Sequence, residues 1–234
     1  MHSTHRYRCA AGISFFVLIA AFVLYLLVAL SLPVIKPIYL FQLNFATQPG
    51  QPETSIATNF RFGVWGFCAS SVLNAPTILT NNGECTSPKL GYDIPPDILA
   101  LSGYPTSVTT SLVKALTVLL VLHPVSAGLS LLTVFFSLFL RSQYFTILAL
   151  ITGILAAVVG SVVLAADLAL KIIAGNRLQS ALNGLLVVTF GDGVWMIVAA
   201  VALSWLGVIS LSAVACRCCG IRRKYGWYED GYHG

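Results

Sequence analysis

Four long apolar segments divide the chain. No Asp, Glu, Lys or Arg occurs within residues 11–32, 115–140, 142–166 or 193–216. Each segment is longer than the ~20 residues that an α-helix needs to cross a bilayer. Because every backbone amide in the hydrocarbon must find a partner within the protein, such runs favour helices over strands. The pattern predicts four membrane-spanning helices, which places both ends of the chain on the same side.

The segments between these spans differ in length and charge. A short N-terminal segment (1–10), a one-residue turn (141) and a tail (217–234) alternate with two larger loops, 33–114 and 167–192. Basic residues are dense in the short segments, and those in the large loops are matched by six acids. Segments rich in Lys and Arg beside a membrane tend to stay cytosolic. We therefore expect cytosolic termini and extracellular loops. The formal net charge of +5 then suits an anionic inner leaflet and does not indicate nucleic acid.

The first apolar segment has one alternative interpretation, a cleaved signal peptide, because basic residues precede it. Its apolar core is longer than the usual ~7–15 residues of a signal peptide. The sequence Leu30-Ser31-Leu32-Pro33 also lacks a small-x-small cleavage site. An uncleaved helix is favoured.

The six cysteines fall into two groups by compartment. Cys68 and Cys85 lie in the first outer loop, whereas Cys9, Cys216, Cys218 and Cys219 lie at or inside the expected cytosolic boundary. Two cysteines on the oxidising side favour a disulfide, with a pair of free thiols as the alternative.

The cytosolic cluster Cys216-Arg217-Cys218-Cys219 supplies three thiols without a nearby His, which is too few ligands for a tetrahedral metal site. Cysteines beside basic residues at a membrane are candidates for S-acylation. Unmodified thiols are the other interpretation.

The first outer loop has the composition of a small folded domain. Three segments, 34–45, 59–70 and 84–92, have strand-like composition, and stretches rich in Pro, Thr, Asn and Gly separate them. In the second outer loop, residues 178–190 are apolar but too short to span a bilayer. We expect them to extend this extracellular domain.

The centre of the first loop carries a recognisable motif, Phe62-Gly63-Val64-Trp65-Gly66-Phe67-Cys68, followed by Cys85 and Lys89-Leu90-Gly91-Tyr92. This resembles the Gly-Leu-Trp…Cys…Cys signature of claudin-like tetraspan proteins. It is more closely similar to the fungal PalI family of ambient-pH-signalling proteins and to allied tetraspan proteins of the eisosome, a furrow-like domain of the plasma membrane. Other segments that fit this pattern are Leu32-Pro33-Val34-Ile35-Lys36, Leu122-His123-Pro124-Val125 and Asp167-Leu168.

The resemblance implies an all-α membrane fold: a four-helix bundle with a small extracellular antiparallel β-sheet. It also implies a plasma-membrane protein that is an accessory of alkaline-pH sensing and binds a pH sensor. The alternative is an organiser of membrane domains and cell wall that binds proteins of those structures. The cysteine ring is longer than is usual for PalI-type loops, and the tail is shorter. A related protein with the same fold but another role therefore stays open. The family motif residues are Gly63, Trp65, Gly66, Cys68 and Cys85.

Three of these features have competing interpretations at the residue level. Trp65 suits either the membrane interface or a small buried core. His123, deep in the second span and followed by Pro124, is either a proton switch or a neutral side chain that bonds backbone groups freed by the proline. Asp167 and Lys171, four residues apart, are expected to form an exposed ion pair at the outer end of the third span, with contact between the carboxylate and the outer sheet as the alternative.

The sequence shows no constellation typical of an enzyme. We find no paired carboxylates within a span, no metal-ligand spacing, no phosphate-binding Gly loop and no nucleophile elbow. We therefore expect no catalytic residues, no metal and no cofactor. A transporter or channel would carry several charges or broken helices near the membrane midplane, and only His123 with Pro124 resembles that pattern.

The charge asymmetry makes a testable prediction about topology. A cysteine introduced at Thr54 should be labelled by an impermeant thiol reagent in intact cells, and one introduced at Tyr228 should be labelled only after permeabilisation. The opposite labelling pattern would show an inverted topology.

Overall fold

The computed structural model describes residues 2–45, 59–70, 84–89, 106–139, 142–181 and 186–215. Most of them form the helices α1 (His2–Ala29), α3 (Thr106–Ser137), α4 (Gln143–Ala181) and α5 (Asp192–Ala215). Each helix contains a stretch long and apolar enough to cross a membrane, namely Ala11–Ala29, Thr117–Ser137, Gln143–Ile172 and Asp192–Ala215. The prediction of four long apolar helices is confirmed.

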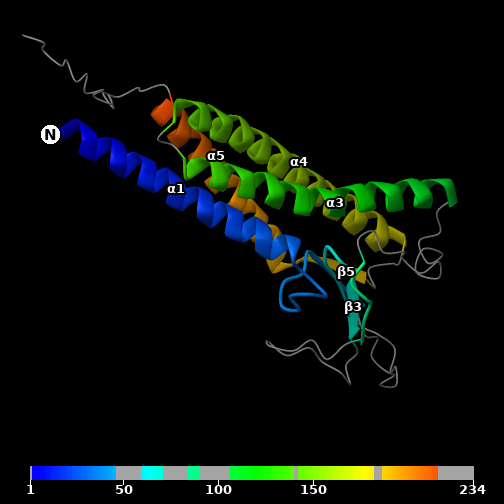
Figure 1. Ribbon diagram of the computed structural model, residues 1–234. Helices are drawn as coiled ribbons and strands as arrows, with labels where there is room; N and C mark the ends of the chain where they lie inside the picture. The colour runs from blue at the N-terminus through cyan, green and yellow to red at the C-terminus, as the bar shows by residue number, and fades with distance from the viewer. Residues whose placement is uncertain are drawn as a thin grey trace, which may run out of the picture.

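The four helices form an elongated bundle with the sheet at one end (Figure 1). Helix α1 packs against α3 and α5, and α4 packs against the same two helices, so the helices surround a common interior. The beginning of α1 and the end of α5 lie together at the end of the bundle that is far from the sheet.

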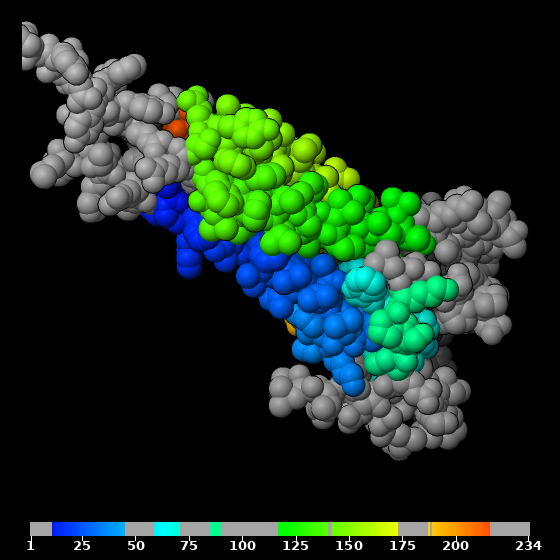
Figure 2. Space-filling view, in the orientation of Figure 1, coloured from blue at the N-terminus to red at the C-terminus, as the bar shows by residue number. Residues whose placement is uncertain are grey.

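Large apolar side chains cover the outside of the bundle. Phe16 on α1 is 74% exposed, and Trp195 and Ile209 on α5 are 66% and 61% exposed. In the space-filling view, α1 and the α3–α4 hairpin lie against each other along one face, and the strands gather at the end of the bundle (Figure 2). Exposed apolar surface of this extent is typical of a lipid-facing protein rather than a soluble one.

The interior of the bundle is lined by small and hydroxyl-bearing side chains. The buried face of α3 presents, at helical spacing, His123, Ser126, Ser130, Thr133 and Ser137. Opposite, a Cβ atom at Gly153 of α4 would lie 3.3 Å from Thr133, and one at Gly160 would overlap the ring of Tyr25 from α1. Small residues allow helices to approach closely where lipid supplies no hydrophobic driving force.

The sheet has five antiparallel strands in the order β4-β3-β2-β1-β5. Strands β1 (Phe41–Phe45), β2 (Asn59–Phe62), β3 (Phe67–Ser70) and β4 (Glu84–Cys85) follow α1. Strand β5 (Leu186–Phe190) comes from the connection between α4 and α5 and pairs with β1 over five residues. The small antiparallel sheet is therefore confirmed. The connection between α4 and α5, which we expected to extend the same domain, contributes an edge strand to it.

The three strand-like segments differ from the prediction in detail: of residues 34–45 only Phe41–Phe45 form a strand, and of residues 84–89 only Glu84–Cys85 do. Residues 59–70 have the composition of a single strand but form the β2–β3 hairpin, which reverses direction at residues 63–66. The glycines that flank Val64 and Trp65 supply the turn. We call residues 59–70 the signature hairpin.

Both central helices continue past their membrane-spanning stretches toward the sheet. Helix α3 begins at Thr106, before its apolar stretch starts at Thr117, and α4 continues from Ile172 to Ala181. The ammonium group of Lys171 lies 3.6 Å from the ring centroid of Phe190, which joins the outer part of α4 to β5. The end of α4 nearest the sheet thus contacts strand β5.

The close approach of α1 and α4 predicts the effect of adding one methyl group. Gly160→Ala should destabilise the protein by about 1–3 kcal/mol, because the new Cβ overlaps the hydroxyl end of Tyr25. Gly128→Ala is the matched control, since nothing lies within 4 Å of a Cβ at that helical position. Thermal unfolding in detergent measures both.

A second variant tests the cause of this effect. Tyr25→Phe should reduce the cost of Gly160→Ala, because it removes the hydroxyl that the methyl group meets. Equal effects of the two glycine substitutions would contradict the proposed packing.

Candidate functional site

The signature hairpin is fixed by hydrogen bonds to the last carbonyl of α1 and to the turn that follows this helix. The indole Nε1–H of Trp65 donates to the carbonyl of Ala29 over 2.5 Å, and the Trp65 backbone N–H donates to the carbonyl of Leu32 over 3.2 Å. The last carbonyl groups of a helix have no partner in that helix. The tip of the hairpin therefore caps the C-terminal end of α1.

Two further contacts fix the position of the hairpin tip. The backbone N–H of Val64 donates to Ser31 Oγ over 3.0 Å, and both residues are fully buried. A Cβ atom at Gly63 would overlap the backbone of Leu32. Glycine is needed at this point because two backbones lie in direct contact.

The opposite side of the hairpin is held by β4 and the residues that follow it. Cys68 and Cys85 are register partners and form a disulfide across β3 and β4. Thr86 bonds the backbone of Phe67 with both its own backbone N–H and its hydroxyl. The backbone N–H of Lys89 donates to the carbonyl of Trp65 over 2.9 Å. The disulfide and these hydrogen bonds thus fix β4 and the residues after it to the hairpin.

The side chain of Trp65 packs into the core and also bonds the end of α1. Its ring is partly buried and packs against the core cluster that contains Val64, Leu120 and Ile197. Its polar edge is used at the helix end and not at a lipid headgroup. All five motif residues, Gly63, Trp65, Gly66, Cys68 and Cys85, lie in this one region.

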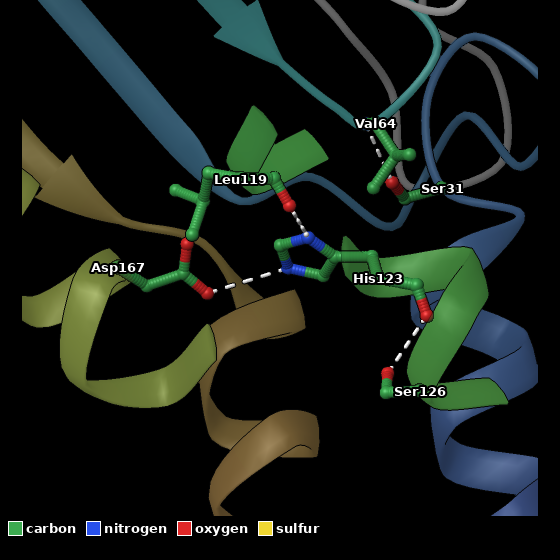
Figure 3. A network of polar contacts seen from close by, with 6 residues as sticks. All are labelled: Ser31, Val64, Leu119, His123, Ser126 and Asp167. Carbon is green, nitrogen blue, oxygen red and sulfur yellow. Dashed lines mark hydrogen bonds and ion pairs between the residues drawn. The ribbon is translucent and has the colours of Figure 1, made fainter. Parts of the chain in front are cut away.

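A second site lies between α3 and α4, in the part of the membrane-spanning stretches nearest the sheet. The imidazole Nε2 of His123 lies 3.4 Å from Oδ2 of Asp167, and the two side chains are 3% and 0% exposed. The Nδ1 atom of the same ring lies 3.0 Å from the carbonyl oxygen of Leu119. Figure 3 shows Asp167 reaching from α4 toward the ring of His123 on α3, with the Ser31–Val64 contact in the same region. We call His123 and Asp167 the polar pair.

The polar pair has few other partners. Nε2 of His123 and both carboxyl oxygens of Asp167 are buried, and among the described residues no hydrogen bond to these three atoms is formed. Removing one member of a buried ion pair typically costs about 3–5 kcal/mol, because the other is left without a partner. The contact between His123 and Asp167 therefore holds α3 and α4 together at this level of the bundle.

The structure corrects the expectation for Asp167. It does not form an exposed ion pair with Lys171. The carboxyl group points into the bundle toward His123, and the ammonium group of Lys171 lies over the ring of Phe190. The reason is that α4 does not end near Asp167 but continues to Ala181, so the carboxyl group sits on a packed stretch of helix.

His123 contacts a backbone carbonyl as one of its two interpretations required, but not the carbonyl that Pro124 leaves without its helical donor. That carbonyl belongs to Leu120, four residues before the proline, whereas the ring contacts Leu119. The sequence did not predict the pairing with Asp167. A signal for it exists: His123 and Asp167 are the only Asp, Glu, His, Lys or Arg residues in the stretches 117–137 and 143–170. Ionisable groups in adjacent spans tend to pair.

Other candidate residues give less. Cys216, Cys218 and Cys219 lie outside the described residues. Within the described residues, no group of three or more His, Cys, Asp or Glu side chains is placed to hold a metal ion. Ser31 and Thr86 hold the signature hairpin but carry no sequence pattern that distinguishes them from other hydroxyl residues.

The contact between Ser31 and Val64 yields a matched pair of substitutions. Ser31→Ala should destabilise the protein by about 1–3 kcal/mol, because it leaves the buried N–H of Val64 without an acceptor. Ser212→Ala, which removes an exposed hydroxyl bonded within its own helix, should change stability by less than about 0.5 kcal/mol. Unfolding temperatures in detergent compare the two. A neutral Ser31→Ala would show that this bond does not hold the hairpin.

Comparison with known proteins agrees with this architecture. The model of the SUR7/PalI family matches residues 10–216, which include all four apolar helices, the signature hairpin and the polar pair. No curated protein was found to match the chain. The match covers most of the sequence, and the chain belongs to the SUR7/PalI family of non-catalytic, multi-pass membrane proteins.

Proposed function

We propose that this protein is a plasma-membrane accessory of ambient alkaline-pH signalling that acts by binding partner membrane proteins. The observation that supports this role best is the polar pair. It is the one ion pair between described side chains, and it lies in the membrane-spanning part of the bundle beneath the sheet. Ionisable groups are costly in a membrane and are therefore functional candidates.

The family signature supports a role in binding rather than chemistry. Its tryptophan, glycines and disulfide fix a sheet to the end of a helix, and none of their polar groups is left to act on a substrate. The result is a folded extracellular surface in a fixed position on a four-helix bundle. Such a surface suits recognition of another membrane protein.

The second candidate function is organisation of membrane domains and the adjacent cell wall. It is favoured by the exposed apolar and aromatic side chains on several helices, among them Phe16, Trp195 and Ile209. Such faces suit lateral packing with lipid or other membrane proteins. The match to the SUR7/PalI family does not distinguish the two functions, so an experiment must separate them.

Deletion of the gene provides that experiment. Loss of a signalling accessory should impair growth at alkaline pH and block proteolytic activation of the transcription factor of the pathway. Re-expression of the wild-type chain should restore both, whereas Ser31→Ala should restore them only in proportion to its abundance at the surface. The tagged protein should co-purify with a pH sensor from native membranes.

A different result would replace this proposal. If the deletion strain responds normally to alkaline pH but shows altered wall-stress sensitivity or furrow organisation, the organiser function holds instead. Co-purification of furrow-coating or wall-synthesis proteins would lead to the same conclusion.

A further inference from the structure

We propose that the polar pair is a proton-binding site that ties α3 to α4, and that release of its proton at alkaline pH loosens these two helices beneath the sheet. The inference deepens the proposed function by naming the groups through which pH would act. It rests on geometry alone and is tested on purified protein.

The first step concerns the proton on Nδ1 of His123. This atom lies 3.0 Å from the carbonyl oxygen of Leu119. A carbonyl oxygen only accepts hydrogen bonds, so the ring nitrogen must be the donor and carries a proton. The tautomer of the imidazole is thereby fixed, and Nε2 faces Asp167.

The second step concerns the space between Nε2 and the carboxyl group. Without a further proton, a nitrogen lone pair would face a carboxylate oxygen at 3.4 Å, and the two would repel each other. With one proton between them, the pair is either imidazolium and carboxylate or imidazole and carboxylic acid. Both forms are neutral overall and hold the same number of protons. The contact between α3 and α4 therefore requires this shared proton.

The third step is the consequence of losing that proton. The pair would then hold one uncompensated negative charge on a side chain with no exposed surface. No other hydrogen bond from a described residue reaches either carboxyl oxygen. A charge of this kind is stable only after hydration, which requires the outer parts of α3 and α4 to separate.

Other titratable groups near the pair are already engaged or distant. On α1, Tyr25 lies against Gly160, seven residues or roughly 10 Å along α4 from Asp167. On α4, Lys171 contacts the ring of Phe190, and near the sheet Arg61 lies over the ring of Tyr39. The buried face of α5 carries no ionisable group, and Asp192 at its start is exposed. Lys114 on α3 is nine residues before His123, and its side chain lies outside those described.

The connection to the sheet follows from the chain path. Beyond Asp167, α4 continues to Ala181 and leads to β5, which pairs with β1 along its whole length. On α3, Leu120 packs in the same core cluster as Val64 of the signature hairpin. Separation of the two helices at the pair would thus disturb both the edge strand and the packing beneath the hairpin.

The direction of the pH effect follows from proton counting. The closed state holds the shared proton, whereas the open, hydrated state can release it to solvent. The closed state then binds one more proton than the open state, so opening becomes more favourable as pH rises. The opening equilibrium should therefore increase with pH, by up to about tenfold per pH unit.

Hydrogen–deuterium exchange of the purified full-length protein in detergent micelles measures this equilibrium. Residues 117–127 and 160–172 should lose protection with rising pH, after correction for the intrinsic pH dependence of amide exchange. Residues 205–215 of α5 should show no such loss. Asp167→Asn should remove the pH dependence, because the asparagine cannot share a proton with the ring. Lys171→Gln is the matched control, one turn further along α4, and should retain the wild-type slope.

The outcomes are separable. A wild-type protein without a slope in the two outer segments overturns the proposal, and so does an Asp167→Asn variant that keeps the slope. If Asp167→Asn cannot be recovered folded, His123→Gln is used in its place. Loss of the slope then supports the proposal, and retention of the slope overturns it. A slope confined to the outer segments and lost in these variants supports the proton site even if deletion leaves alkaline growth normal. A missing slope leaves the accessory role itself untouched.

Discussion

The last carbonyl groups of α1 have no partners within their own helix, and at the edge of a membrane they cannot rely on water alone. The signature hairpin supplies the partners. The side chain of Trp65 donates to the carbonyl of Ala29, the last residue of α1, and its backbone N–H donates to the carbonyl of Leu32 in the turn after the helix. The backbone N–H of Val64 donates to Ser31 in the same turn. These three hydrogen bonds determine where the hairpin lies, and the other strands take their positions relative to it.

The dependence runs through the sheet to the far helices. Strand β2 of the hairpin pairs with β1, which continues from the turn after α1, and β1 pairs with β5, which connects α4 to α5. At the other edge, the disulfide between Cys68 and Cys85 joins β4 to the hairpin. A sheet of short strands is weak by itself. Here the strands are held in place because the sheet is attached to α1 on one side and to the α4–α5 connection on the other.

Much of this architecture could be predicted from the sequence because the physical signals are strong and local. Uncharged runs longer than a bilayer is thick specify helices, and the motif around Trp65 specifies the family. The pairing of β5 with β1 and the partner of Asp167 could not be derived in the same way. Both depend on how two distant segments meet in space, and the spacing of Asp167 and Lys171 on one helix face suggested a different local pair. The continuation of α4 beyond the apolar stretch decided against that pair.

The two sites differ in how they respond to their surroundings. The hairpin contacts use backbone groups, an indole and a serine hydroxyl, none of which changes charge over the physiological pH range, so this attachment is constant. In the proposed site, the contact between His123 and Asp167 instead requires a proton that can be exchanged with solvent. The attachment of the hairpin to α1 does not depend on pH, whereas the contact between α3 and α4 depends on protonation. One side of the bundle is therefore rigid and the other is adjustable. If the adjustable side opens, the sheet stays attached to α1, and the displacement falls on α4 and on strand β5 at the edge of the sheet. That edge is accordingly where a partner protein would sense the change.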